Sequence, residues 1–118
     1  MITVYGLKNC DTCRAALKWL EAQTLEHHFH DLRKDGVDAT AIQRWSGAVG
    51  WDILLNKRGT TWRGLDDAVK DATTATNASA LMADHPALIK RPVFETDTGG
   101  PIIVGFKEEQ RQQLIDLK

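Results

Sequence analysis

The sequence predicts an α/β fold in which a βαβ unit and a ββα unit build one mixed sheet. Three observations predict it. A β-branched and aromatic run at residues 2–5 ends at Gly6 and is followed by residues with helical spacing. Two further apolar runs flank a Gly-Gly turn near the other end of the chain. The segment 33–88 between these parts shows helical patterns and no convincing strand.

The first part of the chain predicts strand, helix and strand. After the strand at 2–5, a helix is expected from Asp11, because apolar residues recur at helical spacing while charged residues fall largely on the other side. The segment 25–32 then alternates loosely, with Phe29 between two histidines, as a second strand would. The apolar helix positions are Ala15, Ala16, Trp19 and Leu20.

The last part predicts a hairpin and a helix. Residues 92–95 and 101–105 read as two strands joined by the turn Thr96-Asp97-Thr98-Gly99-Gly100. A closing helix is expected over 108–117, with Leu114 and Leu117 on one side. A βαβ unit followed by a ββα unit around one mixed sheet is the plan of the thioredoxin fold.

The segment 33–88 predicts a helical insert in a single thioredoxin-like domain that spans residues 1–118. Asp38 is placed to cap a helix that Gly47 would end. Further helices are expected around 51–55 and 65–69, and after Asn77.

The composition predicts one globular domain that needs no disulfide bond or bound metal for its stability. The 118 residues are 42% hydrophobic and 26% charged, with a formal net charge of −1. This charge gives no overall basic field for nucleic-acid binding. No run approaches the ~20 apolar residues of a membrane span, and the first residues do not resemble a signal peptide. We therefore expect a monomeric cytoplasmic protein that binds neither membrane nor nucleic acid.

The two cysteines, Cys10 and Cys13, lie three positions apart at the expected start of the first helix. Unpaired N–H groups and the helix dipole favour an anion there, and the cations Lys8 and Arg14 favour a thiolate further, although Asp11 opposes them. Cys13 falls on the same side of the helix as Cys10. It could therefore resolve a mixed disulfide formed at Cys10.

Two other interpretations of the cysteines stay open. The pair could join two of His27, His28 and His30 in a zinc site, but no second pair with metal-ligand spacing is present. The pair could also be two inert buried thiols. A C-x-x-C motif that follows a strand and opens a helix favours redox chemistry over both.

Three motifs carry a resemblance that spans nearly the whole chain. They are CDTCR at 10–14, LLNKRGTTW at 54–62 and HPALIKRPV at 85–93. With them the chain resembles the arsenate reductase (ArsC)/Spx family, and most closely its YffB-like branch. The resemblance implies a thioredoxin fold with a helical insert.

The resemblance also implies roles for single residues. Cys10 matches the nucleophile, and Arg58 and Arg91 match arginines that hold an oxyanion or the carboxylates of glutathione. Cys13 stands where arsenate reductases carry serine and Spx proteins carry the second cysteine of a redox pair. Pro92 matches a cis-proline beside the cysteines, so that Arg91 would face them. The expected substrate-binding residues are Arg14, Arg58, Arg91 and Pro92.

Phe106 departs from the arsenate reductases, which the resemblance indicates have a third arginine in this region. The function expected first is therefore a glutathione-dependent thiol-disulfide reductase. A redox-sensing, Spx-like regulator that binds RNA polymerase is the alternative, and arsenate reduction comes third. Glutathione is the expected co-substrate, glutaredoxin a candidate partner, and no metal, flavin or nucleotide is implied. The variant Phe106→Arg would test whether a third arginine at this position gives the protein arsenate reductase activity.

Overall fold

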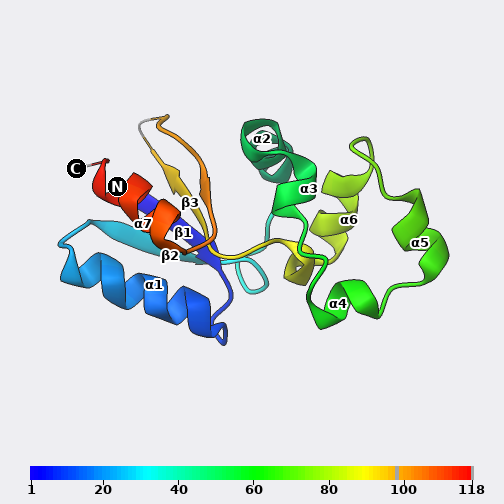
Figure 1. Ribbon diagram of the computed structural model, residues 1–118, viewed down its shortest axis with the longest axis horizontal. Helices are drawn as coiled ribbons and strands as arrows, with labels where there is room; N and C mark the ends of the chain where they lie inside the picture. Colours follow the sequence, from blue (N-terminus) through cyan, green and yellow to red (C-terminus); the bar gives the residue numbers. More distant parts are fainter. Residues whose placement is uncertain (98, 118) are drawn as a thin grey trace. The chain divides into compact units, whose positions relative to one another are not determined.

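The computed structural model describes residues 1–97 and 99–117 and divides the chain into two compact units (Figure 1). The sheet unit comprises Met1–Gly36 and Arg91–Lys118, and the helical unit comprises Val37–Lys90. The single domain with an insert at 33–88 stays a prediction. Thr98 of the predicted hairpin turn lies outside the described residues.

The sheet unit contains the predicted βαβ and ββα units (Figure 1). Its strands lie in the order β2-β1-β3-β4, with β1 parallel to β2 and antiparallel to β3, and β3 antiparallel to β4. This mixed sheet is thioredoxin-like, which confirms the predicted fold class. The elements are β1 (Ile2–Gly6), α1 (Asp11–Ala22), β2 (His27–Asp31), β3 (Val93–Thr96), β4 (Ile103–Val104) and α7 (Glu108–Ile115).

The core of the sheet unit lies between one face of the sheet and the helices α1 and α7. Alternate residues of β1, Ile2 and Val4, are buried, because successive side chains of a strand point to opposite faces. They form one cluster with Leu20 of α1, Phe94 of β3 and Leu114 of α7. This packing fixes α1, and with it the helix N-terminus at Cys10, relative to the end of β1.

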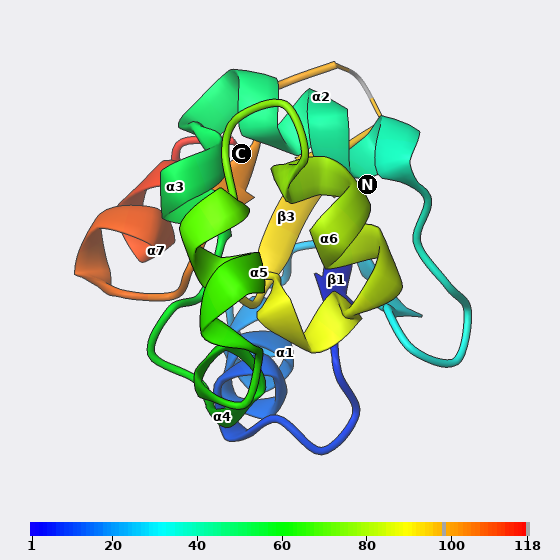
Figure 2. The same ribbon diagram turned by 90° about the vertical axis from the view of Figure 1, so that its right-hand side faces the viewer.

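The helical unit is built from short helices, as predicted (Figure 2). Helix α2 packs against α3 and α6, and Trp45 of α2 is fully buried. Among the described residues this unit has no strand, only an isolated bridge between Leu55 and Ile89. Its elements are α2 (Ala39–Val49), α3 (Trp51–Leu54), α4 (Thr60–Arg63), α5 (Asp67–Ala72), α6 (Ala78–Asp84) and the 3₁₀ helix η1 (Pro86–Leu88).

The two ends of α2 test the predicted helix signals. Asp38 caps the helix as predicted, because its carboxylate accepts a hydrogen bond of 2.9 Å from the backbone N–H of Ala41. The predicted stop at Gly47 is wrong. The helix continues through this glycine, which costs only about 1 kcal/mol relative to alanine, and ends at Val49. The next residue, Gly50, has a φ of 95°, which few other residues adopt.

Two elements, α4 and η1, were not predicted. They contain four and three residues, which is too short for an apolar period to be visible. Asn77 precedes α6 as predicted, but its side chain caps no N–H of that helix. It accepts from the N–H of Thr74 and donates to the carbonyl of Ala72, both at 2.8 Å, and so closes the loop before α6.

No helix of the described ranges 1–97 and 99–117 has both the length and the apolar character that a bilayer span requires.

Candidate active site

Cys10 lies at the N-terminus of α1, as the sequence predicts. Strand β1 ends at Gly6, and the loop 7–10 turns back so that the N–H of Cys10 donates to the carbonyl of Leu7 at 3.2 Å. Cys10 is the N-cap residue of α1, and its carbonyl accepts the N–H of Arg14 at 3.0 Å. Both cysteines are free thiols. The loop thus presents a half-buried thiol to the unpaired N–H groups of the first helical turn.

The thiol of Cys10 has a pKa below its ordinary value. Burial alone would raise this pKa, but the backbone N–H of Cys13, the Cys13 thiol and the guanidinium of Arg91 together lower it. Sulfur is a weak acceptor, so the contact with the Cys13 N–H is electrostatic rather than a capping hydrogen bond of the kind that serine makes. Cys10 is therefore the cysteine suited to act as a nucleophile at neutral pH.

The thiol of Cys13 has the opposite character. Its residue is 1% exposed, and burial is the main cause that raises the pKa of Cys13 to about 12. A backbone hydrogen bond at Leu7 opposes this rise, and the neighbouring Cys10 adds to it. Cys13 is therefore a buried, neutral thiol next to the nucleophilic thiol of Cys10.

Arg91 and Pro92 stand at the entry to β3, in the same unit as the cysteines. The Arg91–Pro92 peptide bond is cis, and the carbonyl of Pro92 accepts the N–H of Gly105 at 2.9 Å. The Arg91 side chain hydrogen-bonds Cys10 and acts on it through its charge. The structure thus brings together three of the predicted site residues, Cys10, Cys13 and Arg91, and Pro92 follows Arg91 across a cis peptide bond.

Two other predicted site residues, Arg14 and Arg58, have different surroundings. Arg14 is exposed, and its guanidinium pairs with the carboxylate of Asp11 at 3.0 Å. Arg58 belongs to the helical unit, where it is exposed and follows Asn56 in a tight turn. Arg63 donates a hydrogen bond to the carbonyl of Arg58. Arg58 thus belongs to a different unit from the cysteines.

Phe106 lies in an aromatic cluster of the sheet unit. Its ring meets Trp19 edge to face, with 5.6 Å between the centroids, and lies 6.3 Å from the ring of Phe94. The guanidinium of Arg111 covers the ring at 4.9 Å. The side chain at position 106 therefore packs against the core rather than adding a group to the thiol of Cys10.

Two of the three histidines considered as metal ligands, His27 and His30, contact backbone carbonyls. A ring nitrogen of His27 lies 2.8 Å from the carbonyl of Leu25, and one of His30 lies 2.6 Å from the carbonyl of Gly36. Within residues 1–97 and 99–117, no three histidine, cysteine, aspartate or glutamate side chains gather as a metal site.

Sequence reasoning missed two residues at the strand ends near this site, Gly6 and Asp31, which pair in register. Gly6 lies against the sulfur of Cys13. Asp31 at the end of β2 is 8% exposed, and its carboxylate accepts backbone N–H groups of the following turn. An aspartate that ends a strand before the polar run RKDG was a turn signal, but nothing in the sequence linked it to the cysteines.

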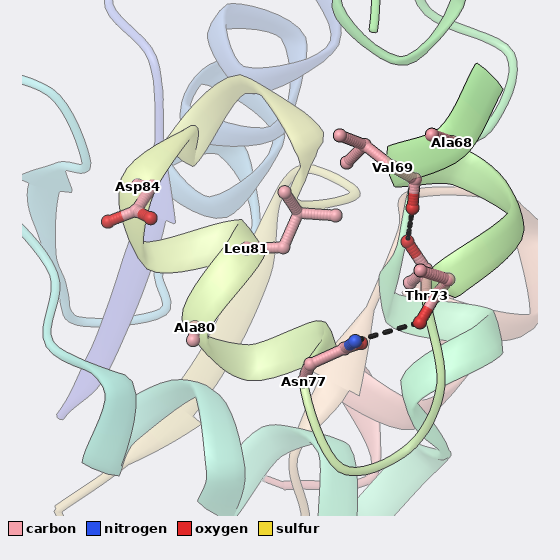
Figure 3. Close-up of a pocket in the computed structure, with 8 residues that line it drawn as sticks. Ala68, Val69, Thr73, Asn77, Ala80, Leu81 and Asp84 are labelled. Atoms are coloured by element: carbon pink, nitrogen blue, oxygen red, sulfur yellow. Dashed lines mark hydrogen bonds between the residues drawn. The ribbon is translucent and has the colours of Figure 1, made fainter. Parts of the chain in front are cut away.

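A cavity of about 420 Å³ lies within the helical unit between α5 and α6. Figure 3 shows Val69 and Leu81 pointing toward each other across it, with Thr73 and Asn77 at one end. Its lining is mostly apolar and contains no thiol or cation. The chemistry needed for a reactive site thus lies at Cys10.

Comparisons with known proteins agree with the fold and the motifs. An uncharacterized protein of Haemophilus influenzae is 48% identical over 112 residues, 95% of this chain and 96% of the relative. A solved structure of a YffB protein is 38% identical with a TM-score of 0.89, covering 98% of this chain and 99% of the other. An arsenate reductase (ArsC) related protein from Brucella melitensis is 42% identical with a TM-score of 0.74, covering 95% and 92%.

More distant relatives include regulators. The global transcriptional regulator Spx of Staphylococcus epidermidis is 21% identical over 120 residues, which cover 100% of this chain and 89% of that protein. The sequence model of the ArsC family matches residues 5–114, a range that includes both cysteines, Arg58 and Arg91. The chain therefore belongs to the ArsC family.

Proposed function

We propose that this protein is a glutathione-dependent thiol-disulfide reductase with Cys10 as its nucleophile. The observation that carries the proposal is the lowered pKa of Cys10 at the N-terminus of α1, beside the guanidinium of Arg91. A thiolate attacks disulfides, whereas a neutral thiol does not. Membership of a family whose relatives include an arsenate reductase (ArsC) related protein supports a redox reaction.

The reaction proceeds by two thiol-disulfide exchanges. The thiolate of Cys10 attacks the glutathione sulfur of a mixed disulfide, forms a disulfide between Cys10 and glutathione, and releases the substrate as a thiolate. The thiolate of a second glutathione then attacks the glutathione sulfur of that adduct. This step releases oxidised glutathione and regenerates the Cys10 thiolate. In total, the mixed disulfide is reduced to the substrate thiol, and its glutathione leaves joined to the second glutathione as oxidised glutathione. The proposed reaction uses no metal, flavin or nucleotide.

Resolution by the second glutathione is favoured over resolution by Cys13. Attack by Cys13 on the adduct would need its thiolate, but its pKa of about 12 keeps it protonated near neutral pH. The 1% exposure of Cys13 also restricts its approach to an adduct that lies outside. Cys13 instead stabilises the Cys10 thiolate through its backbone N–H and its thiol.

The arginines are proposed to bind the anionic groups of glutathione. Arg91 carries its charge beside Cys10, and a guanidinium can bind a carboxylate with two parallel hydrogen bonds. Arg58 is added from the family resemblance and from its exposed guanidinium. Arg14 already pairs with Asp11, so a carboxylate would have to compete for it.

A second candidate is a redox-sensing regulator that binds RNA polymerase. The relative named as the global transcriptional regulator Spx favours it, as do the two cysteines three residues apart. In this function, oxidation of Cys10 and Cys13 to a disulfide would be the signal. The burial and raised pKa of Cys13 count against a readily formed disulfide.

Intact mass after incubation of the reduced protein with oxidised glutathione tests both functions. For the reductase, we expect the protein to gain one glutathione, Cys10→Ser to gain none, and Cys13→Ser to gain one as well. Loss of two hydrogens without added glutathione would favour the regulator. An unchanged mass would contradict both. Turnover of a glutathione mixed disulfide, coupled to glutathione reductase, then tests catalysis.

A further inference from the structure

The ammonium group of Lys57 lies over two tryptophan rings of the helical unit. Its Nζ is 5.5 Å from the ring centroid of Trp51 and 5.6 Å from that of Trp62. Trp51 begins α3 and Trp62 belongs to α4, and the turn 56–59 lies between these helices in the chain (Figure 2). Both distances are within the range of cation–π attraction. The two rings therefore restrict an otherwise flexible lysine side chain.

The backbone of this turn is fixed by hydrogen bonds. The N–H of Asn56 donates to the carbonyl of Leu88 at 2.7 Å, and the side-chain oxygen of Asn56 accepts the N–H of Arg58 at 3.1 Å. The guanidinium of Arg63 donates to the carbonyl of Arg58. Both the side chain of Lys57 and the backbone around it are therefore held in place.

The cations at this turn have no carboxylate partner. Lys57, Arg58 and Arg63 are exposed, and in the part of the chain that the structure describes no aspartate or glutamate pairs with any of them. By contrast, Arg14 and Arg111 each pair with a carboxylate of their own helix. Three positive charges thus gather without an internal counter-ion, and this favours the approach of an external anion.

We propose that Lys57 is a glutathione-binding residue: its ammonium, held by Trp51 and Trp62, binds a carboxylate of glutathione. Because the rings already restrict the side chain, binding an anion there costs less conformational entropy than at a free lysine. The rings also offer a flat apolar surface to the peptide chain of the ligand. The proposal rests on the proposed function, because it takes glutathione as the co-substrate.

Three roles of Lys57 predict different results. If its ammonium binds the carboxylate directly, its removal weakens binding whether or not the guanidinium of Arg58 is present. If Lys57 only tethers the turn so that Arg58 can bind, its removal has no further effect once that guanidinium is gone. A packing role needs only the apolar stem of the lysine side chain.

The test is the affinity for S-methylglutathione, which keeps both carboxylates of glutathione but cannot form a disulfide. Isothermal titration calorimetry measures this affinity for the wild type, Lys57→Met, Lys57→Arg, Arg58→Met and the double variant of Lys57→Met and Arg58→Met. Methionine keeps an unbranched apolar stem and removes the charge, whereas arginine restores a cation. Lys18→Met is the matched control, because it removes an exposed lysine of α1 in the same way. Thermal unfolding follows the fold of each variant.

We expect Lys57→Met to bind S-methylglutathione about tenfold more weakly than the wild type, through the loss of one charge-assisted contact. Lys57→Arg should recover most of this affinity, and Lys18→Met should bind as the wild type does. Adding Lys57→Met to Arg58→Met should weaken binding further by a similar factor. Wild-type affinity in Lys57→Met, or no further loss in the double variant, would overturn the proposal.

Tryptophan emission shows where the ligand binds. Of the four tryptophans, Trp51 and Trp62 lie at Lys57. A carboxylate that binds the ammonium changes the charge over both rings, so S-methylglutathione should shift the emission of the wild type. The shift should be smaller in Trp51→Phe and in Trp62→Phe. Saturating binding that leaves the emission unchanged would overturn the proposal, and this measurement decides if Arg58→Met binds too weakly for the double variant to be measured.

These results separate the binding site from the reaction. If S-methylglutathione binds through Lys57 but the wild type turns over no glutathione mixed disulfide, the reductase function fails and the binding role stands. If the wild type turns over a mixed disulfide and Lys57→Met binds like the wild type, the reductase function stands and the role of Lys57 fails. A wild type that binds no S-methylglutathione also overturns the role of Lys57.

Discussion

The sulfur of Cys13 occupies the space that a side chain on Gly6 would need. A Cβ built on Gly6 would lie 2.5 Å from the Cys13 sulfur and 3.3 Å from its Cβ. Real Cβ atoms do not approach this closely, so the last residue of β1 has to be glycine for Cys13 to pack as it does. The buried thiol and the strand end are thus matched to each other.

Gly6→Ala is expected to destabilise the protein by about 1–3 kcal/mol, the usual cost of overpacking a core. Urea unfolding measures the loss. Gly47→Ala is the matched control, because a Cβ there meets nothing within 4 Å and alanine favours the interior of α2. Adding Cys13→Ala to Gly6→Ala should recover part of the loss, since the clashing sulfur is removed. A Gly6→Ala protein as stable as the wild type would contradict the packing.

Alkylation between pH 6 and 7 is expected to label Cys10 before Cys13. The thiolate is the reacting form, and the rate rises as the pH passes the pKa of the thiol. The lowered pKa of Cys10 brings its rise to lower pH, whereas the pKa of about 12 for Cys13 delays its rise to strongly alkaline solution. Peptide mapping by mass spectrometry gives the order. Preferential labelling of Cys13 would reverse the assignment of the nucleophile.

Arg91→Ala is expected to raise the pH midpoint of Cys10 alkylation, because the guanidinium is one of the groups that lower the pKa of this thiol. Loss of a charge-assisted contact should also weaken glutathione binding by about 1.5–3 kcal/mol. Lys18→Ala, which removes an exposed cation further along α1, is the control for a general charge effect. If Arg91→Ala binds glutathione normally and its alkylation midpoint does not move, Arg91 is not part of the site. A melting point far below that of the wild type would instead show that the role of Arg91 is structural.

Arsenate reductase activity is expected to be weak or absent. One missing charge-assisted contact to a tetrahedral dianion costs on the order of ten- to a hundredfold in affinity or rate. A coupled assay with glutathione, glutaredoxin and arsenate measures it, with the reduction of a glutathione mixed disulfide as the positive control. Robust arsenate turnover by the wild type would show that another cation, such as Lys107, serves instead.

Phe106→Arg, proposed from the sequence as a gain-of-function variant, has a different expected result in view of the structure. Phe106 packs against Trp19 and Phe94 and under Arg111. Arginine there would lose this packing and meet a like charge, so we expect a loss of stability of about 2–4 kcal/mol and no gain in arsenate reduction. Thermal unfolding and the same coupled assay measure both. A stable, arsenate-reducing Phe106→Arg would contradict the packing.

The sequence predicted what local patterns encode. The strand at 2–5, the helix from Asp11 and the cap at Asp38 follow from propensity, periodicity and capping chemistry, which act within one turn or strand. The position of Cys10 at a helix N-terminus followed from the same signals. The sequence also indicated the two units of the mixed sheet, because each is a run of neighbouring elements.

Only the tertiary structure decided which residues surround the cysteine pair. Gly6 packs against the sulfur of Cys13, and Arg91 acts on Cys10 from a segment about 80 residues away, which no local pattern encodes. The sequence by itself thus determined the fold class and the nucleophile position. The pKa of Cys10 is lowered and that of Cys13 is raised because folding buries Cys13 and brings Arg91 to Cys10. These surroundings exist only in the folded chain.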